Sequence, residues 1–245
     1  MITRFAPSPT GYLHYGHAYA AEQAFGYAQK HGGACLLRIE DIDHTRCKAE
    51  LTDAIFEDLK WLGFNWPTPV RIQSEHQSDY KILISDLSDK GLLYRCFKTR
   101  KDLPKGLYRG APDLDETIHL KNEKPFSWRL SISQSEQVLG QTYPDLSDEI
   151  IARKDIGNSY LLACTYDDAL QNITHVVRGE DMKSFTAYQI LLQKLMGWPT
   201  PDYIHHEVVK NPDGKKLSKR NQDTTIRSLR AQGLSPADVM AMAGV

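Results

Sequence analysis

The chain has 245 residues, 41% of them hydrophobic and 25% charged, which is an ordinary globular composition with material for one large core or a core with a small insert. This composition excludes the disordered, collagen-like and low-complexity classes. Thirty Lys and Arg against thirty-one Asp and Glu leave a net charge of -1. Binding of nucleic acid through overall charge is therefore excluded, whereas binding through a local patch is not.

The first residues run into prolines rather than an apolar segment, and no stretch has the length and apolarity that a bilayer span needs. The four cysteines are far apart and show no CxxC spacing, which in a chain of this length indicates reduced thiols rather than a disulfide framework. They are Cys35, Cys47, Cys96 and Cys164. We therefore expect a cytoplasmic protein that has no membrane partner and acts as a monomer.

The first forty residues predict a strand, a helix and a second strand. Ile2–Phe5 has the pattern of a short buried strand, and a loop rich in Pro and Gly follows it. From Gly16 to Ala28 apolar residues recur every three or four positions, which predicts a helix that ends at the Gly32-Gly33 pair. Ala34–Ile39 is an apolar run of strand length. A helix that connects two strands in this way implies parallel pairing and a right-handed crossover.

Alternating elements continue along the chain. We expect helices around Ile55–Leu62 and after Ser74, which is positioned to cap the second one. Further on, Ser159–Thr165 predicts a buried strand, Met182–Met196 an amphipathic helix, and Tyr203–Val209 another strand. The fold class is therefore α/β, with a Rossmann-like doubly wound parallel sheet.

The periodicity is lost between about Cys96 and Pro125, and residues 126–132 alternate like an antiparallel strand. This change predicts a small inserted α+β module. We divide the chain into a Rossmann-like domain at 1–94 and 156–209, the inserted module at 95–155, and a loop with a short C-terminal helical segment at 210–245.

The first candidate site lies at residues 6–17, between the first strand and the first helix, where an α/β sheet exposes its strand ends to ligands. His14 and His17 can donate hydrogen bonds to phosphate oxygens, Gly16 lets a nucleotide approach the backbone, and a helix N-terminus favours anions. Two alternatives stay open. One histidine caps or packs while the other is solvated, or both bind a metal, for which no third ligand is apparent.

The second candidate is residues 215–220, where four cations occur in six positions after a turn. Such a loop can close over a polyphosphate and neutralise charge that develops during phosphoryl or nucleotidyl transfer. The alternative is a solvated run of charges.

The third candidate is the group of Glu40, Asp41 and Asp43, at the end of the second predicted strand. Because side chains alternate along a strand, at least one of these acids must face the ligand cleft, where it suits an ammonium group or a metal ion. Helix capping or a salt bridge is the alternative.

Together these segments resemble the signatures of class I aminoacyl-tRNA synthetases. Residues 14–17 are similar to the HIGH motif and residues 216–220 to the KMSKS motif, in the same order and at comparable spacing. Residues 4–11 and 38–41 narrow the resemblance to the glutamyl branch. Residues 177–181 also fit the substrate pocket of that branch. The resemblance covers nearly the whole chain, and it implies that the insert is like an acceptor-binding module.

The resemblance also implies roles for individual residues. The catalytic residues would be His14, His17, Lys216 and Lys219, and the ATP-binding residues His14, Gly16, His17 and Lys219. The glutamate-binding residues would be Arg4, Ala6, Ser8, Glu40, Tyr160 and Arg178. Glu40 would hold the α-ammonium group and Arg178 the side-chain carboxylate, which the planar guanidinium can bind in a bidentate manner. The alternatives are a core aromatic for Tyr160 and a surface ion pair for Arg178.

The implied reaction is attack of the glutamate carboxylate on the α-phosphate of ATP, with Mg²⁺ present, to give glutamyl-adenylate. Only 25 residues follow Arg220, too few for the anticodon-binding domains of the full-length enzymes. The chain thus resembles the shortened members of the branch, which activate L-glutamate without tRNA and transfer it to queuosine in the anticodon of tRNA(Asp). A fragment that charges a tRNA 3′ end and an inactive tRNA-binding paralogue are the alternatives.

The insert departs from the family pattern. The family's zinc site combines a Cys-x-Cys pair, a downstream Tyr and a further Cys, whereas this chain has Cys96, Lys98, Tyr108 and, near the last position, Pro112. Two ligands do not satisfy a closed tetrahedral site, so we expect no zinc.

Two basic segments are consistent with an RNA partner. Residues 95–109 carry six cations against one acid, and residues 205–230 carry seven cations against three acids. Both can grip a phosphate backbone, and the alternative is a pair of solvated loops.

Overall fold

The computed structural model describes residues 1–209 and 225–245. The chain forms two compact units. Unit 1 comprises Met1–Glu75, Gln171–Lys183 and Pro201–Val245, and unit 2 comprises His76–Leu170 and Ser184–Thr200. These two units are defined by packing. The domain division from the sequence rests on expected functional roles and stays a prediction: 1–94 with 156–209, 95–155, and 210–245.

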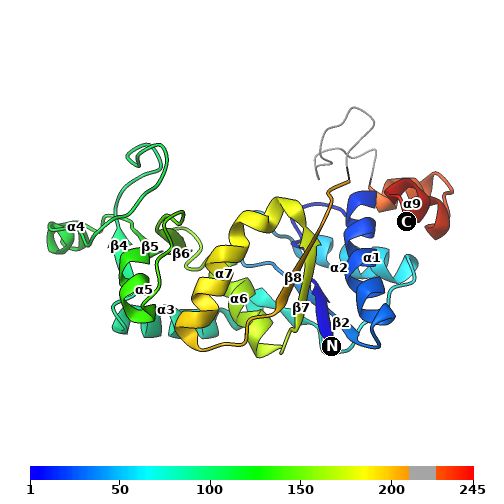
Figure 1. Ribbon diagram of the computed structural model, residues 1–245. Coiled ribbons are helices and arrows are strands. Elements are labelled where there is room, and N and C mark those ends of the chain that lie inside the picture. The colour runs from blue at the N-terminus through cyan, green and yellow to red at the C-terminus, as the bar shows by residue number, and fades with distance from the viewer. Residues whose placement is uncertain (210–224) are drawn as a thin grey trace. The chain divides into compact units, whose positions relative to one another are not determined.

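Unit 1 contains a parallel sheet (Figure 1). Its strands are β1 (Ile2–Phe5), β2 (Ala34–Ile39), β3 (Arg71–Ile72), β7 (His175–Gly179) and β8 (Asp202–His206). β2 pairs in parallel with both β1 and β3, and β7 pairs in parallel with β8. β7 lies beside β1, where the Thr174 N–H donates to the Ile2 carbonyl at 2.9 Å. The strands thus form two hydrogen-bonded sets, β1-β2-β3 and β7-β8, which adjoin through β1 and β7. From β1 the chain adds β2 and β3 on one side and β7 and β8 on the other, as in a doubly wound fold.

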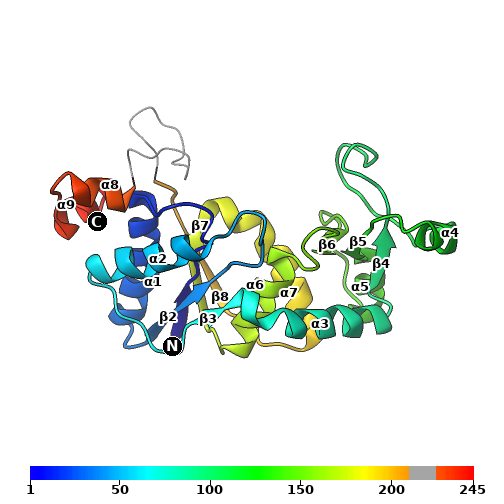
Figure 2. The same ribbon diagram turned by 180° about the vertical axis from the view of Figure 1, so that it is seen from behind.

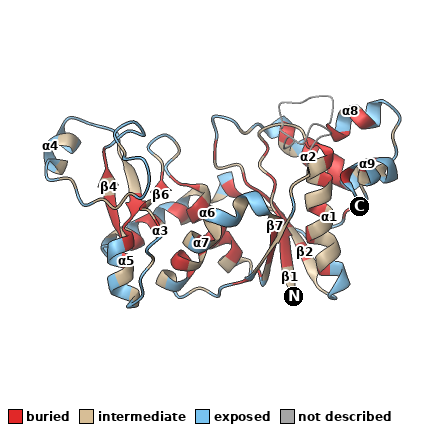
Figure 3. Ribbon diagram, turned by 45° about the horizontal axis from the view of Figure 1, so that its top comes forward, coloured by how far each residue is buried: buried red, intermediate tan, exposed pale blue. Residues whose placement is uncertain are grey.

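Helices α1 (Tyr15–Lys30), α2 (Ala49–Trp61), α8 (Ile226–Ala231) and α9 (Pro236–Ala243) complete unit 1. β1, β2 and β7 form its buried centre (Figure 3), and α9 packs against α1, as Figure 2 shows from behind. Side chains of α8 and α9 belong to the same core as those of β1 and β2: Ile226, Leu229, Val239 and Ala243 are at most 5% exposed. The C-terminal helical segment is therefore part of the hydrophobic core.

Unit 2 contains an antiparallel sheet of β4 (Leu93–Cys96), β5 (Ser127–Leu130) and β6 (Glu149–Ala152), with β5 in the middle. Its helices are α3 (Gln77–Asp89), α4 (Glu116–Lys121), α5 (Ile132–Leu139), α6 (Tyr160–Leu170) and most of α7 (Lys183–Met196). The short 3₁₀ segments η1 (Gln73–His76) and η2 (Glu180–Met182) precede α3 and α7.

The predicted fold class is confirmed, as are the first two strands, the antiparallel strand of the insert and the helix that ends at Met196. The strand predicted at Ser159–Thr165 is wrong, because α6 begins at Tyr160. An unbroken apolar run cannot be assigned by periodicity alone, and α6 is buried on nearly all sides. Ser74 does not cap α3: it lies in η1, and its hydroxyl donates to Asp41 at 2.6 Å.

Across the parts of the chain that the structure describes, no helix is both long and apolar enough to cross a membrane.

Asp58 is a buried carboxyl on the core side of α2, with 3% of its surface exposed. Burial raises its pKa from 3.8 to about 7; the charge of Glu57 adds to the effect, and Arg227 and Arg230 oppose it. The folded chain therefore holds this proton more tightly than the unfolded chain, so stability falls as pH rises from about 4 to about 7. Above pH 7 the destabilisation is fully present.

We predict that Asp58→Asn, which removes the buried charge, raises the midpoint of thermal unfolding at pH 8. A rise of at least about 2 °C is expected, the shift that about 1 kcal/mol produces in a chain of this size. The gain over the parent protein should shrink toward zero near pH 4. Circular dichroism across this pH range measures it, with the exposed Asp53→Asn on the same helix as the matched control. A lower midpoint for Asp58→Asn at pH 8 would contradict the prediction.

Candidate active site

The loop between β1 and α1 places both predicted histidines at the start of the helix. His14 is the N-cap residue, with extended backbone, and its N–H donates to Nδ1 of His17 at 3.1 Å. The two ring centroids are 3.9 Å apart. His14 is buried, while His17 and Gly16 are half-buried. Two imidazoles thus gather at the positive end of the α1 dipole, where an anionic group is favoured.

A backbone contact joins this loop to the C-terminal part of the chain. Thr225, where the described chain resumes, forms an antiparallel bridge with His14. The N–H of Ile226 donates to the carbonyl of Leu13 at 2.8 Å. Thr225 and Ile226 are therefore fixed beside the loop that carries the histidines. The predicted catalytic lysines, Lys216 and Lys219, lie outside the described residues.

Four of the six glutamate candidates lie at the carboxyl ends of β1 and β2. Arg4 is on β1 and Glu40 directly follows β2, and both are buried, with 4% and 7% of their surface exposed. The N–H of Glu40 donates to the carbonyl of Pro7 at 3.1 Å, so Glu40 lies against the loop that contains Ala6 and Ser8. The structure brings these residues together at the edge of the sheet where such folds bind ligands.

A buried arginine, Arg38, lies next to Glu40. Arg38 has no exposed surface, and its Nη1 lies 3.8 Å from Oε1 of Glu40. Its Nε donates to Oε1 of Gln171 at 2.8 Å. Because the guanidinium is fixed by this side-chain amide, it restrains the Glu40 carboxylate from within the protein.

Arg178 lies at the carboxyl end of β7, with 8% of its surface exposed. Its guanidinium carbon is 5.2 Å from the centre of the Tyr203 ring on β8, and Tyr203 stacks with His205 at 6.4 Å and 9°. His205 pairs with Arg178 in register. Burial, together with the charges of Arg178 and Lys183, lowers the pKa of His205, which keeps this imidazole neutral at pH 7. A cation held over an aromatic ring presents its donors in a fixed direction.

Tyr160, the remaining glutamate candidate, belongs to unit 2. It begins α6, and its ring lies edge-to-face with that of Phe185, with centroids 5.8 Å apart.

Asp41 and Asp43, the other acids of the third candidate group, have structural contacts. Asp41 accepts hydrogen bonds from the backbone and side chain of Ser74 at 2.8 and 2.6 Å. Asp43 accepts from the Thr45 hydroxyl at 2.6 Å and pairs with Arg46 at 2.7 Å. Hydrogen bonds from Thr45 and Arg46 outweigh burial and hold the pKa of Asp43 below its usual value. Asp41 and Asp43 are thus held by neighbouring parts of the chain, and Glu40 stays the predicted partner of the ammonium group.

The two remaining ligands of the family's zinc site lie near each other in unit 2. Sγ of Cys96 is 3.9 Å from the Tyr108 hydroxyl. Two cations approach the Tyr108 ring, Lys98 at 5.5 Å and Arg129 at 5.3 Å from its centre. Such cations disfavour a divalent metal. Within residues 1–209 and 225–245, no group of three or more His, Cys, Asp and Glu side chains is arranged to hold a metal ion.

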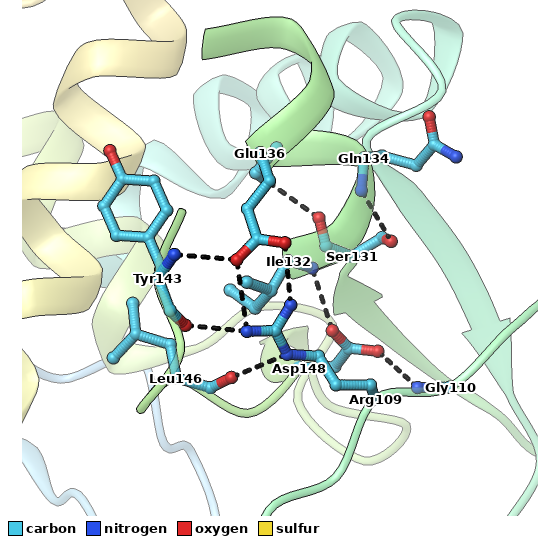
Figure 4. Close-up of polar contacts among 10 residues, drawn as sticks. Arg109, Gly110, Ser131, Ile132, Gln134, Glu136, Tyr143, Leu146 and Asp148 are labelled. Atoms are coloured by element: carbon cyan, nitrogen blue, oxygen red, sulfur yellow. Dashed lines mark hydrogen bonds and ion pairs between the residues drawn. The ribbon is translucent and has the colours of Figure 1, made fainter. Parts of the chain in front are cut away.

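Asp148 fixes the end of the basic segment of the insert (Figure 4). This carboxylate is 2% exposed and accepts from the N–H groups of Gly110 and Ile132, at 2.6 and 2.8 Å, and from the Tyr94 hydroxyl at 2.9 Å. Burial, followed by the contacts with Tyr108 and Asp148, raises the pKa of Tyr94, so its hydroxyl keeps its proton and stays a donor.

Arg109 makes a second set of contacts in the same network (Figure 4). It forms a two-pronged pair with Glu136 at 3.1 and 3.3 Å and donates to the carbonyls of Leu146 and Tyr143 at 3.0 and 2.7 Å. Hydrogen bonds from Arg109 and from the Tyr143 backbone lower the pKa of Glu136. Asp148 and Arg109 thus hold the segment through hydrogen bonds and an ion pair.

Two of the six cations in residues 95–109 form ion pairs, which lowers the net positive charge of this segment. Arg109 is paired with Glu136, and Arg95 is paired with Glu116. The exposed cations of this segment are Lys98, Arg100, Lys101 and Lys105. The second basic segment, 205–230, lies largely outside the described residues.

A doubly wound α/β unit with charged side chains at the carboxyl ends of its strands has these groups where such folds bind ligands. The family described as tRNA synthetases class I (E and Q), catalytic domain, matches residues 1–108 and 114–244, and the chain belongs to this family.

Individual proteins are also similar to this chain. The chain is 36% identical to the Glutamyl-Q tRNA(Asp) synthetase of Rhodobacter capsulatus over the full length of both proteins. It is also 36% identical to the Glutamate--tRNA ligase of Aquifex aeolicus, of which it covers 54%. A crystal structure of a glutamate tRNA ligase from Elizabethkingia meningosepticum, in complex with its amino acid, aligns with a TM-score of 0.73, at 26% identity, over 91% of this chain and 52% of that one. The chain thus spans about half the length of these ligases.

Sequence reasoning missed three residues of the site region, namely Gln171, Tyr203 and His205. The sequence carried a signal for two of them, because Tyr203 and His205 alternate on a predicted strand and therefore share one face. The parallel pairing of β7 with β8 brings that face next to Arg178. Nothing in the sequence indicates the contact between Gln171 and Arg38, which are 133 positions apart.

We predict that the purified protein holds zinc far below one atom per chain, because Cys96 and Tyr108 lack two further donors and two cations lie over the tyrosine ring. Metal analysis by mass spectrometry, before and after dialysis against a chelator, measures this. Thermal unfolding should be the same in both samples. Stoichiometric zinc, or a loss of stability on chelation, would contradict the prediction.

Proposed function

We propose that this protein activates L-glutamate with ATP in the absence of tRNA, and then transfers the glutamyl group to the queuosine base in the anticodon of tRNA(Asp). The observation that carries the activation step is the bridge between His14 and Thr225. The acceptor is supported by the full-length similarity to the Rhodobacter capsulatus synthetase. We expect the protein to act as a monomer in the cytoplasm.

In the activation step the glutamate carboxylate attacks the α-phosphate of ATP and pyrophosphate leaves. His14 and His17, at the N-terminus of α1, would stabilise the charge that develops on the α-phosphate, and the half-buried Gly16 leaves the backbone accessible to the nucleotide. Mg²⁺ bound with ATP would offset the phosphate charge.

Lys219, with Lys216, would stabilise the leaving pyrophosphate. Lys219 precedes Thr225 by six residues, which limits its Cα to about 20 Å from the Thr225 Cα along an extended chain. Because Thr225 is bonded beside His14, this reach includes a triphosphate bound at the start of α1. The lysine segment and the histidine loop can therefore act on the same nucleotide.

Arg178 would bind the side-chain carboxylate of glutamate, and Glu40 its α-ammonium group. Tyr203 lies against the Arg178 guanidinium and Arg38 stands behind Glu40, so both charges are held in place before the substrate arrives. Glutamine would bind less well because its neutral amide replaces a carboxylate charge beside the buried guanidinium. The remaining contacts would come from Arg4, Ala6, Ser8 and Tyr160.

A second candidate is the charging of a tRNA 3′ end, which the 36% identity to the Aquifex aeolicus ligase favours. A third, an inactive tRNA-binding paralogue, is disfavoured because the chain retains His14, His17 and Lys219.

We predict that His17→Ala lowers glutamate-dependent exchange of pyrophosphate into ATP by about 10²- to 10³-fold, the typical effect of removing one donor to a transition state. The assay contains no tRNA. His31→Ala is the matched control, since His31 is exposed at the opposite end of the same helix. Full exchange by His17→Ala would remove His17 from the mechanism, and exchange that requires tRNA would favour the second candidate.

We predict that labelled glutamate is transferred to tRNA(Asp) that contains queuosine and not to the same tRNA without it. Nuclease digestion of the labelled tRNA distinguishes the two acceptors, because the label then travels either with the anticodon fragment or with the 3′-terminal nucleoside. The label should be found on the anticodon fragment. Transfer to the unmodified tRNA would contradict the proposed acceptor.

A further inference from the structure

A cavity of about 450 Å³ lies within unit 2. None of the residues assigned above to ATP or glutamate lines it. Its walls come from α3, from the end of α4 and the turn that follows, from β5 and β6, and from residues 153–157. The volume is in the range of cavities that hold small organic groups.

One wall of the cavity is aromatic. Phe126 and Trp128 line it, with their rings edge-to-face at 5.6 Å and 89°. The Arg95 guanidinium lies over both rings, 4.6 Å from the centre of Trp128 and 5.4 Å from that of Phe126. Trp128 is paired in register with both Arg95 and Ala152, so the small alanine side chain on the same face leaves space beside the indole.

The rim of the cavity is positively charged. Four of its lining residues are cations and one, Glu123, is an acid. Lys81, Lys124 and Lys154 are exposed. The fourth, Arg153, is paired with Asp155 at 2.6 Å. An apolar, aromatic interior inside a ring of lysines matches a ligand that is flat and aromatic at one end and anionic at the other.

This cavity is on the opposite face of the antiparallel sheet from the zinc-like position. Side chains alternate along a strand, so Arg95 and Trp128 project to one face and Tyr94, Cys96 and Arg129 to the other. The hydrogen-bonded network around Asp148 therefore supports the sheet from one side and leaves the face with the aromatic wall open to a ligand.

We propose that this cavity takes an unpaired nucleotide of the RNA substrate, with its base against Trp128 and Phe126 and its flanking phosphates on Lys81, Lys124 and Lys154. The inference rests on the proposed function, which supplies an RNA that has an unpaired loop. Stacking of a base on an aromatic ring accepts any base, and the lysines add attraction for the backbone. A peptide ligand would satisfy the aromatic wall but, unless acidic, not the charged rim.

The test is binding of a fluorescent tRNA(Asp) transcript, measured by anisotropy at low salt, to Trp128→Leu. Loss of the stacking surface should weaken binding about tenfold. Trp128→Phe, which keeps an aromatic face, should retain most of the affinity. The matched control is Trp66→Leu, another half-buried tryptophan, which lies in unit 1. A blunt RNA duplex of equal charge, which has no unpaired nucleotide, should bind both leucine variants equally.

A second pair of variants tests the rim. Lys154→Glu should weaken binding of the transcript more than Lys30→Glu, which makes the same change in charge at the exposed end of α1. Equal binding by Trp128→Leu and Trp66→Leu would overturn the proposal, as would equal weakening of transcript and duplex by Trp128→Leu. Because binding is measured without ATP or glutamate, a parent protein that lacks pyrophosphate exchange would contradict the proposed function and leave this result standing.

Discussion

The bridge between His14 and Thr225 is the contact on which the candidate active site depends, because it joins two segments that are more than two hundred residues apart in sequence. The adjoining hydrogen bond from Ile226 to Leu13 fixes the start of α8 at the start of α1. Arg227 lies 5.5 Å from the Tyr12 ring, and Arg230 pairs with Glu57 at 2.8 Å. These contacts fix Thr225 and α8 against the start of α1 and against α2.

The insert shows how a module of this kind holds its shape without the family's full set of zinc ligands. Asp148 accepts from two backbone N–H groups and one tyrosine hydroxyl, and Arg109 donates to two carbonyls and one carboxylate. Each group is satisfied by partners from distant positions, much as a metal joins distant ligands. The basic segment between Cys96 and Tyr108 is thus closed at its base, and its three exposed lysines and one exposed arginine lie on one loop.

The sequence predicted the parts of the fold that carry a local signal. Ile2–Phe5 and Ala34–Ile39 have the bounds that were predicted, because turn-forming residues border short apolar runs. Ser159–Thr165 was assigned wrongly because helix and strand look alike when every face is buried. In the candidate site, motif positions predict roles for Arg4, Glu40 and Arg178, whereas the residues that contact them come from tertiary packing. The buried pair of Arg38 and Gln171 shows this, since neither residue belongs to a local pattern that predicts the other.

The packing of α9 on α1 has a consequence for synthesis on the ribosome. Val239 and Ala243, which help to cover the apolar face of α1, are synthesised more than two hundred residues after that helix. Unit 1 therefore completes its core late, while most of unit 2 is one continuous stretch that can fold as soon as it is outside the exit tunnel. During that interval the nascent chain exposes the apolar face of α1, a surface of the kind that chaperones bind during elongation.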